Sequence, residues 1–230
     1  MQIKIGGVQK FSLLDFPDKI SAIIFTSGCN FRCGFCHNPE LFSNNSDWDE
    51  GKVLSFLETR INKLDGVVIT GGEPTLHKGL ENFIKKIKSL GFLVKLDTNG
   101  TNPKLLEDLI RLKLIDYVAM DIKAPLNKYN QITSVNVNVL EIKRSIDILC
   151  QGLIPYEFRT TALSSQLLIE DFKAIGKLIE GAEKYYIQKF IPSKILDESL
   201  LPDRGYSANE IEFIISILKK YIKFVDVRNI

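Results

Sequence analysis

The residues with the clearest capacity for chemistry are three cysteines that lie close together in the sequence, Cys29, Cys33 and Cys36. They form a C-x3-C-x2-C pattern directly after an apolar run at 20–26, so we expect them on the loop that follows a strand. Three thiolates on a short loop can ligate one iron–sulfur cube, and with three protein ligands one iron keeps an open coordination position. That open iron can bind a substrate directly.

Two other interpretations of the cysteines stay open. A zinc site of the Cys3His type would use His37, but this histidine is adjacent to Cys36 and badly placed to close the same tetrahedron. Three buried free cysteines are the other alternative. Cys150 stands apart from the motif, and since a second 4Fe-4S cluster needs about four more thiolates, an auxiliary cluster is excluded.

Glycines and polar residues follow the next three predicted strands. Two adjacent glycines allow a backbone to approach a ligand closely, and a carboxylate suits an ammonium group. The carboxyl ends of parallel strands meet at one edge, where a β/α architecture builds its active site. A lysine next to a carboxylate has the alternative of a surface salt bridge. The candidates after these strands are Gly71, Gly72 and Glu73, then Asp97 and Thr98, then Asp121 and Lys123.

Arg159 places a positive charge inside the predicted strand 156–160. Its planar fork of donors suits a carboxylate, so it is a candidate for clamping an anionic ligand group. The alternative is an internal ion pair that closes the barrel.

The elements that must position these residues alternate as strand and helix along the chain. Strands are predicted over 20–26, 66–70, 92–96, 115–120, 156–160 and 184–188, with a short closing run at 224–227. Helices are predicted over 49–64, 79–90, 103–112, 139–151, 169–180 and 208–221. The pattern predicts an α/β fold, a partial (β/α)6 TIM-like barrel of parallel strands in a single domain 1–230; a doubly wound open sheet is the alternative. The stretch 191–207 is predicted to be a long functional or covering loop.

Composition excludes several classes of protein. The 230 residues are 45% hydrophobic and 25% charged, with 30 basic and 28 acidic residues and a net charge of +2. This balance excludes a disordered chain, a collagen-like fibre and a polybasic nucleic-acid binder. No apolar run reaches the roughly 18 to 20 residues of a membrane span, and residues 1–7 lack the apolar core of a signal peptide. We expect a cytoplasmic protein with neither nucleic-acid nor membrane partners.

The cysteine motif, with an aromatic residue at Phe35, resembles the signature of the radical S-adenosylmethionine enzymes, and the segment Gly71-Gly72-Glu73-Pro74 resembles the GGEP motif of that family. The resemblance implies a 4Fe-4S cluster held by the three cysteines in the loop 27–40. It also implies that S-adenosylmethionine chelates the open iron through its amino and carboxylate groups, with the backbone and Glu73 of the second motif holding the amino group. An electron from the reduced cluster would then cleave the sulfonium and give a 5′-deoxyadenosyl radical.

Two further segments resemble the glycyl-radical-enzyme activating enzymes: 97–100, which reads DTNG, and 121–123, which reads Asp-x-Lys. The resemblance implies that Asp97, Thr98, Ala119 and Asp121 line a site for S-adenosylmethionine and a monovalent cation. It also implies that Lys123 lies beside the cofactor and that Arg159 binds the cofactor carboxylate. Phe35 and His37 would contact the adenine. The sixth strand lacks the histidine of the pyruvate formate-lyase activator, so Gln188 or a backbone group is the candidate for that contact.

The first forty residues, including 6–20, are similar to the long type of anaerobic ribonucleoside-triphosphate reductase activating proteins. The implied function is reductive cleavage of S-adenosylmethionine and formation of a glycyl radical on a partner enzyme. Anaerobic ribonucleoside-triphosphate reductase is the expected partner, pyruvate formate-lyase the second, and a flavodoxin or ferredoxin the expected reductant.

Two alternative functions are kept. A small-molecule radical S-adenosylmethionine enzyme, such as a 7-carboxy-7-deazaguanine synthase, would close its pocket over a small substrate. An iron–sulfur electron carrier or zinc-binding module belongs to another class and predicts no cleavage of the cofactor. It leaves the glycines and carboxylates at successive strand ends unexplained.

Overall fold

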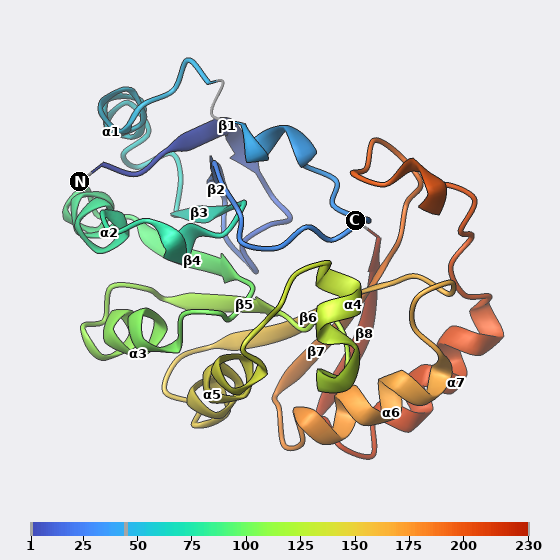
Figure 1. Cartoon of the computed structure of the whole chain (residues 1–230). Coiled ribbons are helices and arrows are strands. Elements are labelled where there is room, and N and C mark those ends of the chain that lie inside the picture. Colours follow the sequence, from blue (N-terminus) through green and yellow to red (C-terminus); the bar gives the residue numbers. More distant parts are fainter. Residues whose placement is uncertain (1, 44–45, 230) are drawn as a thin grey trace. The chain divides into compact units, whose positions relative to one another are not determined.

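The computed structural model describes residues 2–43 and 46–229, and the chain forms two compact units (Figure 1). The first unit comprises Met1–Asn30, Glu40–Ala119 and Leu153–Pro155, and the second comprises Phe31–Pro39, Met120–Gly152 and Tyr156–Ile230. The division falls inside the cysteine motif, because Asn30 belongs to the first unit and Phe31 to the second. Each unit is therefore described separately.

The first unit contains a sheet in which four strands are hydrogen-bonded in chain order. These strands are β1 (Ile5–Ser12), β2 (Ser21–Thr26), β3 (Gly66–Gly71) and β4 (Leu93–Thr98). Strands β2, β3 and β4 are parallel, as predicted, whereas β1 is antiparallel to β2. The sequence prediction missed β1, because the glycine pair at 6–7 interrupts the apolar alternation that marks a strand.

Helices α1 (Glu50–Glu58) and α2 (Leu80–Ser89) connect β2 to β3 and β3 to β4, and α3 (Pro103–Arg111) follows β4. Helix α1 begins where Asp49 accepts a hydrogen bond from the backbone N–H of Lys52 over 2.8 Å, and it ends earlier than the predicted residue 64. A buried apolar cluster in this unit consists of Phe16, Ile23, Val68 and Tyr117. The short helices η1 (Pro39–Phe42) and η2 (Pro74–Leu76) complete this part of the chain.

Strand β5 (Tyr117–Asp121) crosses from the first unit into the second, which continues with the parallel strands β6 (Tyr156–Ala162), β7 (Lys184–Lys189) and β8 (Phe224–Asn229). Its helices are α4 (Tyr129–Thr133), α5 (Val139–Cys150), α6 (Ile169–Leu178) and α7 (Ala208–Leu218), with the short helices η3 (Leu126–Lys128) and η4 (Glu198–Leu200). The predicted α/β class, with strands and helices alternating from β2 to β8, is confirmed.

The strands β6 to β8 carry a polar face. Side chains alternate across a strand, and the register pairs Arg159 with Tyr186 and Gln188 with Arg228. The opposite side of the same strands is apolar and buried, with Phe158, Tyr185 and Ile187 at 0% exposure. We call the first side the polar face; it carries Glu157, Arg159, Thr161, Tyr186, Gln188 and Arg228.

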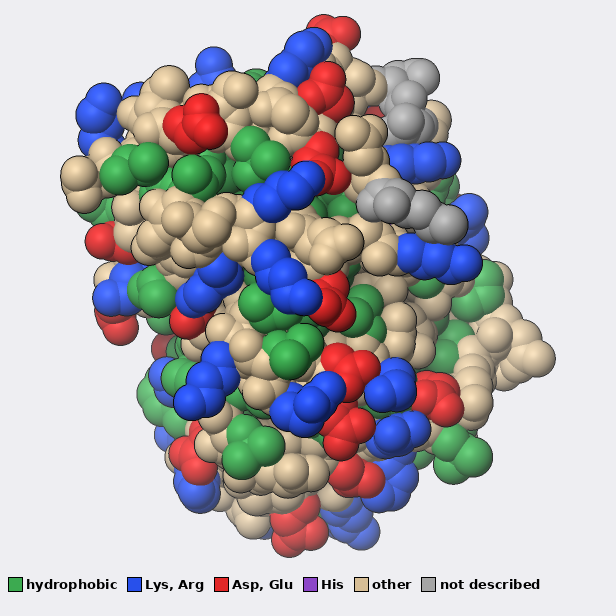
Figure 2. All heavy atoms as spheres, turned by 90° about the vertical axis from the view of Figure 1, so that its left-hand side faces the viewer, with side chains coloured by type: hydrophobic (Ala, Val, Ile, Leu, Met, Phe, Trp, Pro, Cys, Tyr) green, Lys and Arg blue, Asp and Glu red, His purple; other side chains and the backbone are tan. Residues whose placement is uncertain are grey.

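The surface displayed in Figure 2 intersperses basic and acidic side chains with apolar ones. No helix among residues 2–43 and 46–229 is long and apolar enough to cross a bilayer.

Candidate functional site

In the first unit, the segment after β2 lies against the segment after β3. The backbone N–H of Glu73 donates to the carbonyl oxygen of Gly28 over 2.8 Å. A Cβ atom at Gly72 would lie 1.9 Å from that same oxygen, and Gly71 has a φ of +107°. Both glycines are therefore required by the fold, and the close approach places the partly buried Cys29 directly after this contact.

Glu73 binds four protein donors and is fully buried. Its Oε1 accepts from the amide and hydroxyl of Thr75 over 3.1 and 2.5 Å and from the hydroxyl of Thr98 over 2.8 Å. Its Oε2 accepts from the backbone N–H of Asn99 over 2.6 Å. Burial raises the pKa of Glu73, while these hydrogen bonds oppose that shift. Glu73 thus joins the loops after β3 and β4, and its predicted contact with an ammonium group stays a prediction.

The loop after β4 is also tied to the cysteine motif through residues that the sequence analysis missed. The side-chain amide of Asn99 donates to Oδ1 of Asn30 over 2.8 Å, and Asn30 donates to the hydroxyl of Thr101 over 2.9 Å. Asn30 directly follows Cys29, so this network fixes the first cysteine's neighbour. The signal for it was the run of small polar residues at 98–101.

Asp97 forms an ion pair with Lys95, another residue that the sequence analysis did not select. Lys95 is 2% exposed and lies inside β4, two residues before Asp97 and therefore on the same side of the strand. The sequence signal that could have identified Lys95 is a lysine within the apolar run 93–96. The same kind of signal, a charge within a predicted strand, identified Arg159.

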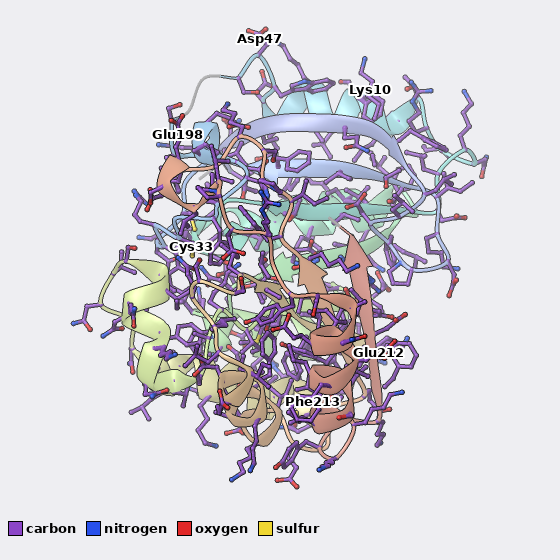
Figure 3. All side chains as sticks on the ribbon, turned by 90° about the vertical axis from the view of Figure 1, so that its right-hand side faces the viewer. Lys10, Cys33, Asp47, Glu198, Glu212 and Phe213 are labelled. Carbon is purple, nitrogen blue, oxygen red and sulfur yellow. The ribbon has the colours of Figure 1, made fainter. Side chains whose placement is uncertain are left out.

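In the second unit, the loop that carries Cys33 and Cys36 is held from two sides. The backbone N–H of Arg32 donates to the carbonyl of Thr133 at the end of α4 over 2.8 Å. From the predicted covering loop, the amides of Leu196 and Asp197 donate to the carbonyls of Cys36 and Gly34 over 3.1 and 2.9 Å. Figure 3 shows Cys33 on this loop, and Glu198 follows in the short helix of the covering segment.

The two aromatic candidates on this loop lie in separate environments. Phe35 is 4% exposed, and the ammonium of Lys123 lies 5.8 Å from the centre of its ring. His37 lies 3.1 Å through Nε2 from the carbonyl oxygen of Ile191, with its ring 5.8 Å from that of Phe190. That contact involves Nε2, one of the two ring nitrogens of His37.

Asp121, Lys123 and Arg159 are brought together at the ends of β5 and β6. Nε of Arg159 and Nζ of Lys123 each lie 2.9 Å from a carboxylate oxygen of Asp121. Burial raises the pKa of Asp121, but the charges of Arg159 and Lys123 prevail and lower it to about 2. Burial opposes the charged form of Lys123, whereas Asp121 and then Cys33 raise the pKa of Lys123 above its usual range. The internal ion pair of Arg159 is confirmed; its binding of a cofactor carboxylate stays a prediction.

The remaining candidates are Ala119, which is buried within β5, and Gln188, which lies half-buried on the polar face. Next to Gln188, the structure adds a cluster that the sequence analysis missed. Glu157 is fully buried and accepts two hydrogen bonds from Arg228 over 2.7 and 3.0 Å, and the guanidinium of Arg228 lies 3.3 Å from the ring centre of Tyr186. The only local sequence signal for this cluster was the position of Glu157, two residues before Arg159.

Residues 2–43 and 46–229 include no group of three or more His, Cys, Asp or Glu side chains placed to hold a metal ion, so the fit to an iron–sulfur cluster with a zwitterionic ligand rests on the chemistry of the side chains. Thiols are the soft ligands that such a cluster takes, and the positive charge of Lys123 attracts a Cys33 thiolate. The backbone around Gly72 leaves no room for side chains, while Lys123 and Arg159 supply two cations to a single carboxylate. By their chemistry, the cations of the second unit can bind an anionic group, and the glycine backbone of the first unit can approach a ligand closely.

Comparisons with known proteins agree with the family resemblance of the cysteine motif. Residues 23–172 match the model of a family described as the Radical SAM superfamily. The whole chain is 36% identical over 237 residues to a Methanocaldococcus jannaschii protein named "Putative glycyl-radical enzyme activating enzyme MJ1227", and the match covers 98% of that protein.

Two solved structures share the fold. The structure described as TYW1 with a lysine-pyruvate adduct bound matches with a TM-score of 0.62 at 18% identity, over 87% of this chain and 73% of that one. A domain of pyruvate-formate lyase-activating enzyme from Bacteroides vulgatus matches with a TM-score of 0.54 at 19% identity, over 69% of this chain and 98% of that one.

Proposed function

Because the chain belongs to the radical SAM superfamily, we propose that it cleaves S-adenosylmethionine and generates a glycyl radical on a partner enzyme. The observation that carries the proposal is the 36% identity, over the full chain, to the Methanocaldococcus jannaschii relative whose name gives that activity. The presence of a single cysteine motif also supports the proposal, because the one other cysteine, Cys150, cannot hold a second cluster by itself.

In the proposed site, Cys29, Cys33 and Cys36 hold a 4Fe-4S cluster. When bound, this cluster supplies the electron that cleaves the sulfonium carbon–sulfur bond of S-adenosylmethionine to methionine and a 5′-deoxyadenosyl radical. A metal ligand of this kind requires the thiolate form of cysteine. The segment at 196–197 fixes the backbone at Gly34 and Cys36 and so preorganises two of the ligands.

The chain's own residues also supply the proposed contacts with S-adenosylmethionine. Arg159 and Lys123 are held by Asp121 on the second unit, and the positive charge of both side chains suits the cofactor carboxylate. On the first unit, the backbone at Gly71 and Gly72 and the carboxylate of Glu73 are the proposed partners of the amino group, and the hydrogen bonds from Thr75 and Asn99 hold that carboxylate in place.

The adenine is assigned to Phe35, His37 and Gln188, as the resemblance implies. For the partner, we propose anaerobic ribonucleoside-triphosphate reductase, which the similarity of residues 6–20 supports, with a flavodoxin or ferredoxin as electron donor. Pyruvate formate-lyase is the second candidate partner.

The first experiment measures cofactor cleavage. The protein is reconstituted anaerobically with iron and sulfide and reduced with dithionite, and 5′-deoxyadenosine is quantified by chromatography after S-adenosylmethionine is added. We expect product from the wild type, none from Cys33→Ala, and wild-type amounts from Cys150→Ala, which makes the same change at an exposed position outside the motif. A fully loaded cluster that yields no 5′-deoxyadenosine would overturn the proposal and favour an electron carrier.

The second experiment identifies the partner. Each candidate enzyme is incubated with the active protein, and the glycyl radical is detected by electron paramagnetic resonance. A variant of the candidate in which the radical glycine is replaced by alanine is the control. Cofactor cleavage without a radical on any candidate would favour a small-molecule radical SAM enzyme instead.

A further inference from the structure

Lys95 is a buried cation in an apolar part of the first unit. It lies opposite Val68 in the parallel register of β3 and β4, and Val68 packs with Phe16, Ile23 and Tyr117. Lysine is almost never fully buried unless it is paired, because an isolated ammonium loses its hydration. The ammonium of Lys95 therefore pairs with a carboxylate near the carboxyl end of β4.

That partner is Asp97, whose carboxylate is 13% exposed while the lysine side chain is 2% exposed. The lysine rises from the apolar interior, and the carboxylate lies beyond it toward the carboxyl end of β4. The next residue, Thr98, uses its hydroxyl to donate to Glu73 and to accept from the amide of Gly100. The negative charge after β4 is thus compensated from within the protein.

In the second unit, Asp121 is likewise paired with protein cations. Its two carboxylate oxygens each lie 2.9 Å from a protein cation, Arg159 or Lys123. The resemblance stated above implies a monovalent cation held by Asp97, Thr98, Ala119 and Asp121. These residues do not fit such an ion, because each carboxylate of the set already faces a protein cation and a further positive charge would be repelled.

We propose that the ammonium of Lys95 takes the place of the monovalent cation and positions Asp97, so that this protein needs no bound Na⁺ or K⁺. An ammonium is a compact single positive charge with three donors, and it is covalently attached here, so no ion has to be recruited. This inference rests on the proposed function, because Asp97 is a candidate residue for S-adenosylmethionine binding. Lys95 acts through Asp97 and is a positioning residue.

The test replaces the charge and measures ion binding without the cluster. Thermal unfolding of the unloaded protein is followed in KCl, NaCl and choline chloride at equal ionic strength, and binding of Tl⁺, a K⁺ surrogate, is followed by thallium NMR. For the wild type, we expect equal midpoints in the three salts and no Tl⁺ binding. For Lys95→Met, which removes the ammonium from beside Asp97, we expect Tl⁺ binding and a midpoint higher in KCl or NaCl by roughly 2–4 °C.

Three variants serve as controls. Lys95→Arg keeps the charge and should remain insensitive to the salt, and Lys95→Met combined with Asp97→Asn should lose the acquired response. Lys88→Met removes a lysine from another ion pair of the first unit, that with Asp116 at 2.7 Å, and should acquire no cation binding.

Specific stabilisation of the wild type by K⁺ or Na⁺, or Tl⁺ binding to it, would overturn the inference. So would a folded Lys95→Met variant that binds no cation. If Lys95→Met does not fold, the wild-type and Lys95→Arg measurements decide the question. Failure of the proposed function would instead appear as no cofactor cleavage in any salt, with these binding results unchanged.

Discussion

The backbone N–H of Asn99 donates a 2.6 Å hydrogen bond to Oε2 of Glu73, so the carboxylate after β3 holds the loop after β4. The same carboxylate accepts from the hydroxyl of Thr98, and Asn99 in turn donates to Asn30 beside the first cysteine. A buried acid therefore organises the polar loops of the first unit, and its hydrogen bonds explain why a charged residue is tolerated at 0% exposure.

The hydrogen bonds of Glu73 predict the effect of Glu73→Gln. The glutamine amide would direct a donor toward the N–H of Asn99, which leaves a buried donor unsatisfied and costs about 1–3 kcal/mol. The free energy of unfolding in urea measures this loss. Glu81→Gln is the control, because its partner Lys85 is on the surface and the pair contributes about 0.5 kcal/mol or less. Equal losses for the two variants would contradict the role of Glu73.

The contact between Gly72 and Gly28 predicts that Gly72→Ala impairs cluster loading. A methyl group 1.9 Å from a backbone oxygen must displace the segment that leads to Cys29. We expect reduced iron and sulfide per chain after reconstitution, measured by chemical analysis. Gly7→Ala is the matched control, because the nearest atom to its Cβ is 4.0 Å away, and it should load normally. Normal loading of Gly72→Ala would show that the loop tolerates the shift.

The low pKa of Asp121 predicts a pH dependence of stability. The folded-state pKa is about 2, below the ordinary value of 3.8, so the stabilisation is present above pH 3.8 and is lost as the pH falls toward 2. The shift corresponds to roughly 2 kcal/mol. We expect Asp121→Asn to lose this component, so its free energy of unfolding should fall less between pH 5 and pH 2.5. Asp147→Asn, at a mostly exposed surface pair, should retain the wild-type difference.

The buried pair of Glu157 and Arg228 predicts an asymmetric mutational response. Arg228→Met leaves a fully buried carboxylate without its two hydrogen bonds, so we expect a loss of roughly 3 kcal/mol in the free energy of unfolding. Adding Glu157→Gln removes the buried negative charge that faced Arg228 and should recover part of that loss, as measured by a double-mutant cycle. A double variant less stable than Arg228→Met alone would contradict this explanation.

Much of the site could be predicted from the sequence because its signals are local. The three thiols lie within eight residues. The candidates Asp97, Asp121 and Arg159 are each a charged residue that lies within or at the end of a predicted strand. The alternation of such runs with helical periodicity fixed the α/β class, since each element is specified by contiguous residues. Where that periodicity was broken, as at the glycine pair 6–7, the strand was missed.

The partners of those residues were decided by the tertiary structure. Glu157 and Arg228 are 71 positions apart, and Glu73 and Asn99 are 26 apart, so only the register of the strands and the course of the loops bring them together. The sequence alone determined that thiols and charges follow successive strands, because side-chain chemistry and spacing are local properties. Whether each carboxylate faces a free ligand or a protein cation, such as Lys95 beside Asp97, depends on burial and pairing, which exist only in the folded chain.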